Sequence, residues 1–202
     1  LFGKDVSLGR NIPQLLGNYQ EGDIAYADLN NDGVVDARDK KMLGNSYPRT
    51  VLGIDANLQY KNWGLYILGT AELGLNVWKN NAYYQNKGEG KYSVLALDRW
   101  HPENNPNGTY PRLTTTEGEN NFVNSSFWLG NGSYFRLKNV ELSYTITNKK
   151  ENALAKKIKI FGRGTNLFSL SREKDLDPEL MNAGVNNYPV YRTLTGGVTV
   201  TF

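Results

Sequence analysis

The sequence contains no cysteine and only one histidine, His101, among its 202 residues. The lack of cysteine excludes a disulfide framework, a thiolate metal site and a cysteine nucleophile. A single histidine without a paired nucleophile gives no pattern for hydrolytic catalysis, so we expect no enzyme activity. No apolar run approaches the roughly 18 to 20 residues of a membrane-spanning helix. The mean hydropathy of -0.55 would by itself indicate a soluble protein, but the alternating strands of a β-barrel average out in the same way.

An excess of one charge is also lacking. The chain has 23 basic and 20 acidic residues, a formal net charge of +3, which excludes the basic footprint of a nucleic-acid-binding protein. The opening "LFGKDVSLGR" has no initiator Met and neither the charged nor the apolar region of a signal peptide. We therefore expect either that a signal was removed or that the chain is a piece of a longer one.

Long alternating strands are what the sequence does contain. Five segments place apolar and polar residues at alternate positions, as strands with two different faces do. In the first of them, Ile54 and Leu58 share the apolar face, whereas Asp55 and Asn57 take the polar one. The five segments are residues 51–60, 63–75, 133–146, 157–168 and 191–202. They exceed the about 5 or 6 residues of a typical soluble strand and suit the roughly 9 to 11 residues of a membrane barrel strand.

The connections between these segments alternate between short and long. A turn at 61–62 is followed by a loop over 76–132, a turn over 147–156 and a loop over 169–189. Bacterial outer-membrane barrels combine short periplasmic turns with long extracellular loops. The pattern favours an all-β fold, namely the C-terminal strands of a large antiparallel transmembrane β-barrel. The alternative is a soluble β-sandwich, whose strands alternate as well.

Five strands are too few to close a barrel, since the smallest single-chain bacterial barrels have about eight. We therefore expect the chain to be the C-terminal part of a larger protein. If the last strand ends in the periplasm, the long connections are extracellular. This predicts two parts: an extracellular loop region over 1–50 with a calcium-loop-like motif, and about five barrel strands over 51–202 with the long loop 76–132. The polar faces, with Asp55, Glu141 and Arg163, would line a wet lumen or touch a plug.

The calcium-loop-like motif is "DLNNDGVVDARD", residues 28–39. Oxygen-bearing side chains stand where an EF-hand loop has its ligands, and Gly33 stands at the position of the sharp turn. The predicted calcium ligands are Asp28, Asn30, Asp32, Val34 through its carbonyl, Asp36 and Asp39. Position twelve is Asp39 rather than the usual Glu, and the flanking sequence is poor helix, so we expect a structural calcium that stiffens a loop. The alternative is a turn that Asp and Asn side chains order by hydrogen bonds to the backbone.

The long loop contains the candidate substrate-binding residues. Trp100, Tyr110 and Trp128 offer aromatic faces for sugar C–H groups, and Arg112 offers hydrogen-bond donors. The alternative, which we favour, is that these residues pack the loop against the barrel or a lid.

Four sequence motifs follow one another along the chain. The first is "GDIAYADLNNDGVVDARDKKMLGNSYPRTVLGIDANLQYKNWGL", with its Asp-x-Asn-x-Asp-Gly run before a Pro and a strand. The others are "RWHPENNPNGTYPRL", "NGSYFRLKNVELSYTI" and the ending "TLTGGVTVTF" with its aromatic last residue. In this order they cover roughly residues 22 to 202. Together they resemble the SusC/RagA family of TonB-dependent outer-membrane transporters of the Bacteroidota.

The resemblance implies a barrel of about 22 strands with a plugged lumen. It also implies several partners: the plug and earlier strands of the same chain, a SusD-like surface lipoprotein as a lid, the TonB complex and outer-membrane lipid. The implied function is uptake of oligosaccharides or peptides across the bacterial outer membrane. The alternative from a different class is a soluble, calcium-stabilised β-sandwich binding module that takes carbohydrate.

Overall fold

The structure is a computed structural model that describes residues 12–115, 120–148, 150, 154–181, 187, 188 and 190–202. Parts of the predicted loops 1–50, 76–132 and 169–189 lie outside these residues. The chain divides into two compact units. The unit that we name the loop unit contains residues up to Gly44 together with Val77–Gly130. The other, the sheet unit, contains Asn45–Asn76, Asn131–Met181 and Tyr188–Phe202.

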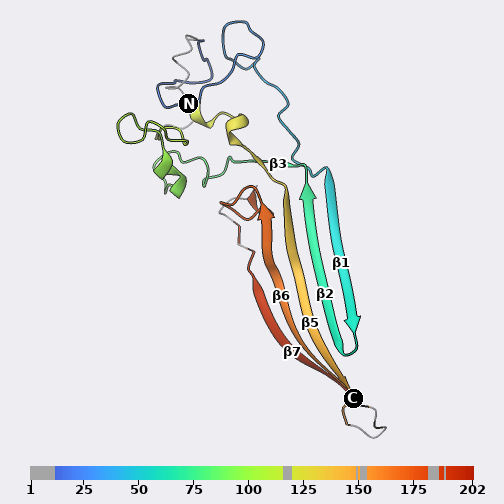
Figure 1. The fold of residues 1–202 in the computed structure, drawn as a ribbon. Helices are drawn as coiled ribbons and strands as arrows, with labels where there is room; N and C mark the ends of the chain where they lie inside the picture. Colours follow the sequence, from blue (N-terminus) through green and yellow to red (C-terminus); the bar gives the residue numbers. More distant parts are fainter. Residues whose placement is uncertain (1–11, 116–119, 149, 151–153, 182–186, 189) are drawn as a thin grey trace. The chain divides into compact units, whose positions relative to one another are not determined.

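One antiparallel sheet of five strands builds the sheet unit, in the order β1-β2-β5-β6-β7 (Figure 1). Its strands are β1 Thr50–Tyr60, β2 Trp63–Leu73, β5 Tyr134–Thr147, β6 Lys157–Ser171 and β7 Thr193–Thr201. A second sheet pairs two short strands, β3 Asn76–Trp78 and β4 Leu129–Asn131. The helical elements described are short 3-10 turns at Val94–Asp98, Asn120–Phe122 and Ser126–Trp128. Among the described residues, none of the helices has the length and apolar character needed to cross a membrane.

The strand register sorts the side chains of the sheet into two faces. A polar row crosses all five strands through Asn57, Tyr66, Glu141, Arg163 and Thr195, each the direct partner of the next. The adjacent row, one residue along each strand, lies on the opposite face because side chains alternate in a strand. It runs through Ala56, Ile67, Val140, Gly164 and Leu194. The sheet therefore has one polar and one apolar face.

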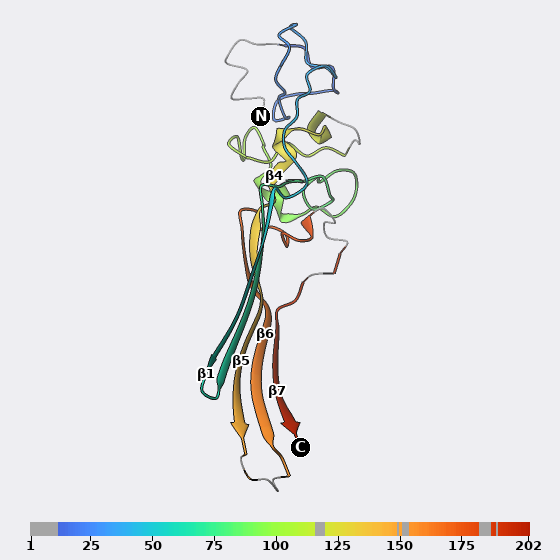
Figure 2. The same ribbon diagram turned by 90° about the vertical axis from the view of Figure 1, so that its right-hand side faces the viewer.

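The apolar face is exposed. The side chain of Ile54 on β1 is 57% exposed and that of Val198 on β7 is 63% exposed. The other exposed apolar side chains of this face include Leu52, Leu58, Leu142, Ile146, Ile160, Leu194 and Val200. Figure 2 shows the five strands turned by 90°, where they follow one another as a single twisted layer. An exposed apolar face of this extent belongs to a sheet whose neighbour is lipid or another protein segment.

Two irregularities in register bend the sheet at one level. Strand β5 has an extra residue, Lys138, between Leu137 and Asn139, where its pairing with β2 shifts. Strand β6 has an extra residue opposite the same point, next to Asn166, whose φ is 50°. Such bulges re-aim side chains and increase the twist of a strand. The predicted loop from residue 169 is corrected here, because β6 continues through Ser171.

Candidate functional site

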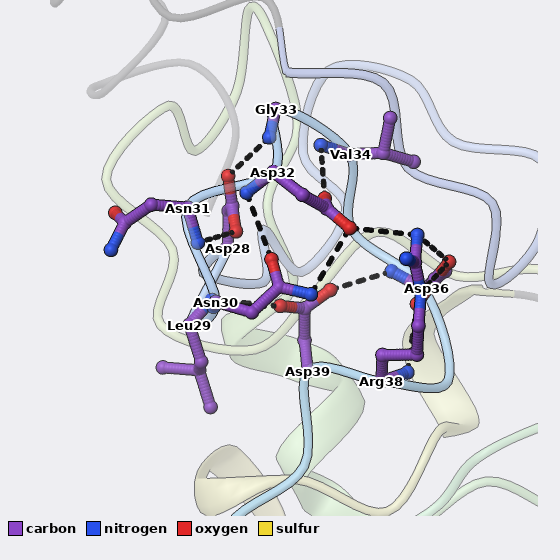
Figure 3. Close-up of polar contacts among 10 residues, drawn as sticks. All are labelled: Asp28, Leu29, Asn30, Asn31, Asp32, Gly33, Val34, Asp36, Arg38 and Asp39. Carbon is purple, nitrogen blue, oxygen red and sulfur yellow. Dashed lines mark hydrogen bonds and ion pairs between the residues drawn. The ribbon is translucent and has the colours of Figure 1, made fainter.

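The motif at residues 28–39 forms a closed loop whose carboxylates accept hydrogen bonds from the loop's own backbone (Figure 3). Asp28 accepts from the N–H groups of Asn31 at 2.7 Å and Gly33 at 2.9 Å. Asn31 and Gly33 have φ angles of 61° and 86°, so the chain reverses sharply at this point. Asp28 thus holds the first half of the loop, as an aspartate at the start of a turn does.

Asp39 closes the second half of the loop. Its Oδ1 accepts from the N–H of Leu29 at 2.8 Å, and its Oδ2 accepts from the N–H of Asp36 at 2.8 Å. These backbone donors lower the pKa of the Asp39 carboxyl, because they favour its charged form. The two ends of the motif are therefore joined through one side chain.

Arg38 stands between the two remaining carboxylates. Its Nη2 lies 2.7 Å from Oδ2 of Asp32 and 2.8 Å from Oδ2 of Asp36. The guanidinium group lowers the pKa of Asp36. Figure 3 shows Arg38 reaching across the loop to both groups. A protein cation thus meets the two carboxylates that a calcium ion would share.

The motif supplies the oxygen donors that calcium prefers, and in this structure those oxygens accept hydrogen bonds from the loop itself. The side-chain oxygen of Asn30 accepts from the N–H of Asp32 at 2.9 Å, and Asp32 accepts from the N–H of Val34 at 3.0 Å. Across the described part of the chain, no group of three or more acidic, histidine or cysteine side chains is placed to hold a metal. Calcium binding by Asp28, Asn30, Asp32, Val34, Asp36 and Asp39 stays a prediction, and it requires Arg38 to leave.

A buried aspartate, Asp23, joins distant parts of the loop unit. Its side chain is 1% exposed, and its Oδ1 lies 2.6 Å from Nε of Arg112. The same oxygen accepts from Nδ2 of Asn121 at 2.7 Å, and Oδ2 accepts from the N–H of Gln20 at 2.8 Å. The donors of Arg112, predicted to bind substrate, thus engage a buried carboxylate within the protein.

Two adjacent buried asparagines that sequence reasoning missed complete this network. Asn121 accepts from the N–H of Ile24 at 2.7 Å, and Asn120 donates to the carbonyl of Ile24 at 2.6 Å. The hydroxyl of Tyr26 donates to the carbonyl of Asn120 at 2.5 Å. Burial raises the pKa of Tyr26 from its ordinary value of 10.0 to about 12. The side-chain amides of Asn120 and Asn121 thus form hydrogen bonds with the backbone of Ile24, nearly one hundred residues away. A neighbouring strand would use its backbone groups for the same two bonds.

The predicted aromatic residues lie inside the loop unit. Tyr110 is buried; its hydroxyl donates to the carbonyl of Tyr84 at 2.8 Å, and burial raises its pKa. Trp128 is buried as well, with its indole N–H donating to the carbonyl of Asn121 at 2.7 Å. The ring of Trp100 packs on Gly22. These aromatic side chains pack within the loop unit. A role of Trp100, Tyr110, Arg112 or Trp128 in substrate binding stays a prediction.

The polar face of the sheet unit carries its own ion pairs. Glu141 on β5 lies 2.7 Å from Nζ of Lys159 and 2.5 Å from Nη2 of Arg163, both on β6. On the same face the hydroxyl of Tyr66 donates to Asp55 at 3.2 Å. Charged groups on one face, beside an exposed apolar face on the other, make a sheet suited to separating water from lipid.

Individual known proteins, rather than a family model, show which family the chain belongs to. No model of a known protein family matches the chain. The chain is 32% identical over 209 residues to the TonB-dependent receptor P26 of Formosa agariphila, an alignment that covers 96% of the chain and 20% of the relative. It is 24% identical over 180 residues to the TonB-dependent receptor SusC of Bacteroides thetaiotaomicron, covering 88% of the chain and 17% of that receptor. The chain belongs to the SusC-like TonB-dependent receptors.

Solved structures of the RagAB system share the fold of this SusC-like chain. The structure of the RagAB peptide transporter matches with a TM-score of 0.61 at 22% identity, covering 78% of the chain and 17% of the matched chain. The RagAB peptide importer in its "open-open" state matches with a TM-score of 0.60 at 21% identity and the same coverage. The predicted family and the all-β, antiparallel fold are thereby confirmed. The chain spans about a fifth of the length of the first relatives it matches, and the strand number of the complete barrel stays a prediction.

Proposed function

We propose that this SusC-like chain forms the C-terminal part of the wall of a TonB-dependent importer in the bacterial outer membrane. The observation that carries the proposal is one continuous sheet with an exposed apolar face and a charged polar face, kept in register over five strands. Lipid is the natural neighbour of such an apolar face, because strands in a membrane barrel alternate apolar-out and polar-in. The polar face with Glu141, Lys159 and Arg163 then lines the lumen.

An aromatic row near one end of the sheet supports this placement. Tyr60, Trp63 and Tyr144 are register partners on β1, β2 and β5, and the rings of Trp63 and Tyr144 lie 4.9 Å apart. Lys61 in the adjoining turn lies over the ring of Tyr60 at 5.3 Å. Tyr and Trp gather at the level of lipid headgroups, where one end of the ring is apolar and the other wet. The row therefore suits a membrane interface at the turn end of the strands.

The descriptions of the relatives support the proposed partners and substrates of the importer. We propose a SusD-like surface lipoprotein as the lid, the remainder of the same chain as plug and earlier strands, and the TonB complex as energy source. Oligosaccharides or peptides are the proposed substrates; the RagAB relative is described as a peptide importer. The loop unit, in which Asp23 is paired with Arg112 and Asn121, would act as a rigid extracellular platform rather than a catalytic site.

The alternative is a soluble, calcium-stabilised β-sandwich module that binds carbohydrate. It requires a second sheet to cover the apolar face, and the exposed Ile54 and Val198 weigh against it. A soluble sandwich also gives no reason for Tyr60 and Trp63 to be exposed side by side.

Fractionation of the native host, with intact mass measurement, tests the proposal. We expect a polypeptide several times 22.7 kDa in the outer membrane, and loss of growth on one class of oligosaccharide or peptide when its gene is deleted. A soluble species close to 22.7 kDa would overturn the importer and leave the binding module. Comparing oligosaccharide with peptide as the sole nutrient separates the two substrate classes.

A further inference from the structure

A buried arginine on β5 holds the segment that follows β6. The side chain of Arg136 is 4% exposed, and its Nη2 lies 2.5 Å from Oδ1 of Asp177. Its Nε lies 3.4 Å from Oε1 of Glu179. Both carboxylates belong to residues 172–181, which we name the strap. The strap is therefore fastened to β5, the central strand of the sheet, rather than to β6, the strand from which it continues.

A second cation from the bulge of β5 joins the same cluster. Nζ of Lys138 lies 2.5 Å from Oε1 of Glu179. Lys138 is the extra residue of the bulge, which lets its side chain reach the strap beside Arg136. Asp177 also accepts the N–H of Glu179 at 3.0 Å, which fixes the two carboxylates relative to each other. Two cations thus meet two carboxylates on one short turn.

The register places this cluster on the polar face. Arg136 pairs with Thr70 of β2 and Ser169 of β6, and it lies on the same face as Tyr134, two residues before it. Thr70 has its hydroxyl oxygen buried without a hydrogen-bond partner in the described structure. Tyr134 is 6% exposed, and Met181 at the end of the strap is 1% exposed. The strap thus covers the polar face at this end of the sheet.

A buried guanidinium is costly to leave unpaired, because its desolvation is no longer offset by a carboxylate. Any outward movement of the strap separates Arg136 from Asp177 and Glu179 and leaves the guanidinium without its two carboxylates. The cluster carries equal numbers of positive and negative groups, so no external ion is needed to balance it. The ion pairs of Arg136 and Lys138 with Asp177 and Glu179 thereby fix the resting position of the strap.

We propose that residues 172–181 form an inward strap, latched by Arg136 and Lys138, that narrows the passage along the polar face of the sheet. The narrowing rests on the proposed function, since only in an importer is that face a transport path. The latch itself does not rest on the proposed function, because its ion pairs lie within the sheet unit whatever the protein does. Release of the latch would widen access to the polar face beside Thr70.

Thiol labelling of the full-length protein tests the latch. These 202 residues contain no cysteine, so Thr70→Cys adds one thiol under the strap. Its reaction rate with a membrane-impermeant maleimide is measured in intact cells with and without the double substitution Asp177→Asn and Glu179→Gln. We expect the unlatched protein to react about tenfold faster, since it loses charge-assisted hydrogen bonds. Asp175→Asn, which removes an exposed carboxylate of the same strap, should leave the rate unchanged.

A second reporter and a milder variant keep the outcome decisive. Thr199→Cys lies on the same face toward the other end of the sheet, and its rate should not respond to the latch. If the double variant does not assemble, Lys138→Gln is used, because this side chain is 30% exposed and pairs only with Glu179 in the cluster. An unchanged labelling rate for the Thr70→Cys thiol in the assembled variant overturns the latch. Failure of the importer proposal would show instead as a soluble protein, on which the same labelling comparison can be made.

Discussion

The indole ring of Trp100 occupies the space where a side chain at Gly22 would begin. A β-carbon built at Gly22 would lie 2.1 Å from Cε3 of that ring. The two residues are distant in sequence and are brought together inside the loop unit, next to the buried Asp23. Glycine is thus required at position 22 for space as well as for its φ of 85°.

Gly33 provides a matched control for this contact. It has a φ of 86°, almost the same as that of Gly22, but a β-carbon there would meet nothing within 4 Å. Both Gly22→Ala and Gly33→Ala should suffer the strain of a positive φ, about 1 to 2 kcal/mol. Gly22→Ala must also displace Trp100, an overpacking cost of typically about 1 to 3 kcal/mol. We expect limited proteolysis to cleave the loop unit faster in Gly22→Ala; equal rates in the two variants would show that the ring is not fixed.

A similar pair lies in the sheet, where the ring of Phe161 covers Gly197 of the neighbouring strand. A β-carbon at Gly197 would lie 2.5 Å from Cζ of the ring, whereas one at Gly196 would meet nothing within 4 Å. Lys159 and Arg163 flank the ring at 5.7 and 5.5 Å, so it has little freedom to move away. Gly197→Ala should lower the free energy of unfolding by about 1 to 3 kcal/mol, and Gly196→Ala should be close to neutral. Thermal unfolding of the detergent-solubilised protein measures both, and equal losses would contradict the fixed ring.

The apolar face offers a direct test of the lipid environment. Ile54→Arg places a charge on that face, and such a change costs about 2 to 4 kcal/mol near the bilayer midplane and less toward its surfaces. Asn57→Arg places the same charge on the polar face of the same strand, where water solvates it. We expect the amount of folded protein in the outer membrane to fall for Ile54→Arg and to stay near normal for Asn57→Arg. Normal assembly of both variants would argue against lipid at this face.

The two faces of the sheet could be predicted because period-2 alternation is a local signal. Ile54, Leu58 and Val200 fall on the apolar face that the sequence indicates, and the turn at 61–62 lies between the paired strands β1 and β2. The bulge at Lys138 was missed, although a trace of it is visible: apolar residues shift from Leu137 to Val140, which changes their parity. A break in parity within one alternating segment is a usable sign of a bulge.

The contacts of the loop unit could not be predicted in the same way. The ion pair of Asp23 with Arg112 and the hydrogen bonds of Asn121 to Ile24 join residues roughly ninety to one hundred positions apart. Such bonds depend on where two irregular segments meet, and neither segment has a period that fixes its direction. For Arg112 and the aromatic residues of the long loop, both substrate binding and packing stayed open with packing favoured, because sequence does not distinguish a buried donor from an exposed one.

Arg38 and calcium should compete for the same carboxylates. Arg38→Gln removes the guanidinium from between Asp32 and Asp36, leaving two neighbouring negative charges that a divalent cation would neutralise. Titration calorimetry on the purified full-length protein should therefore show tighter calcium binding for Arg38→Gln than for the unaltered protein. Lys40→Gln, a neutralised cation just outside the motif, serves as the control. Equal affinity in all three proteins would mean that Arg38 does not hold the place of the ion.

Tyr26 should make the loop unit sensitive to alkaline pH. Burial raises its pKa from 10.0 to about 12, so the folded state resists the ionisation that the unfolded chain undergoes freely. A raised pKa gives a stabilisation that is complete below pH 10 and is lost as the pH rises from 10 through about 12. The hydrogen bond from Tyr26 to the carbonyl of Asn120 is broken when the hydroxyl ionises. Tyr26→Phe should be less stable than the unaltered protein at neutral pH but should lose less stability over this window, measured as protease resistance of the loop unit. Parallel losses in the two proteins would mean that another group governs the alkaline transition.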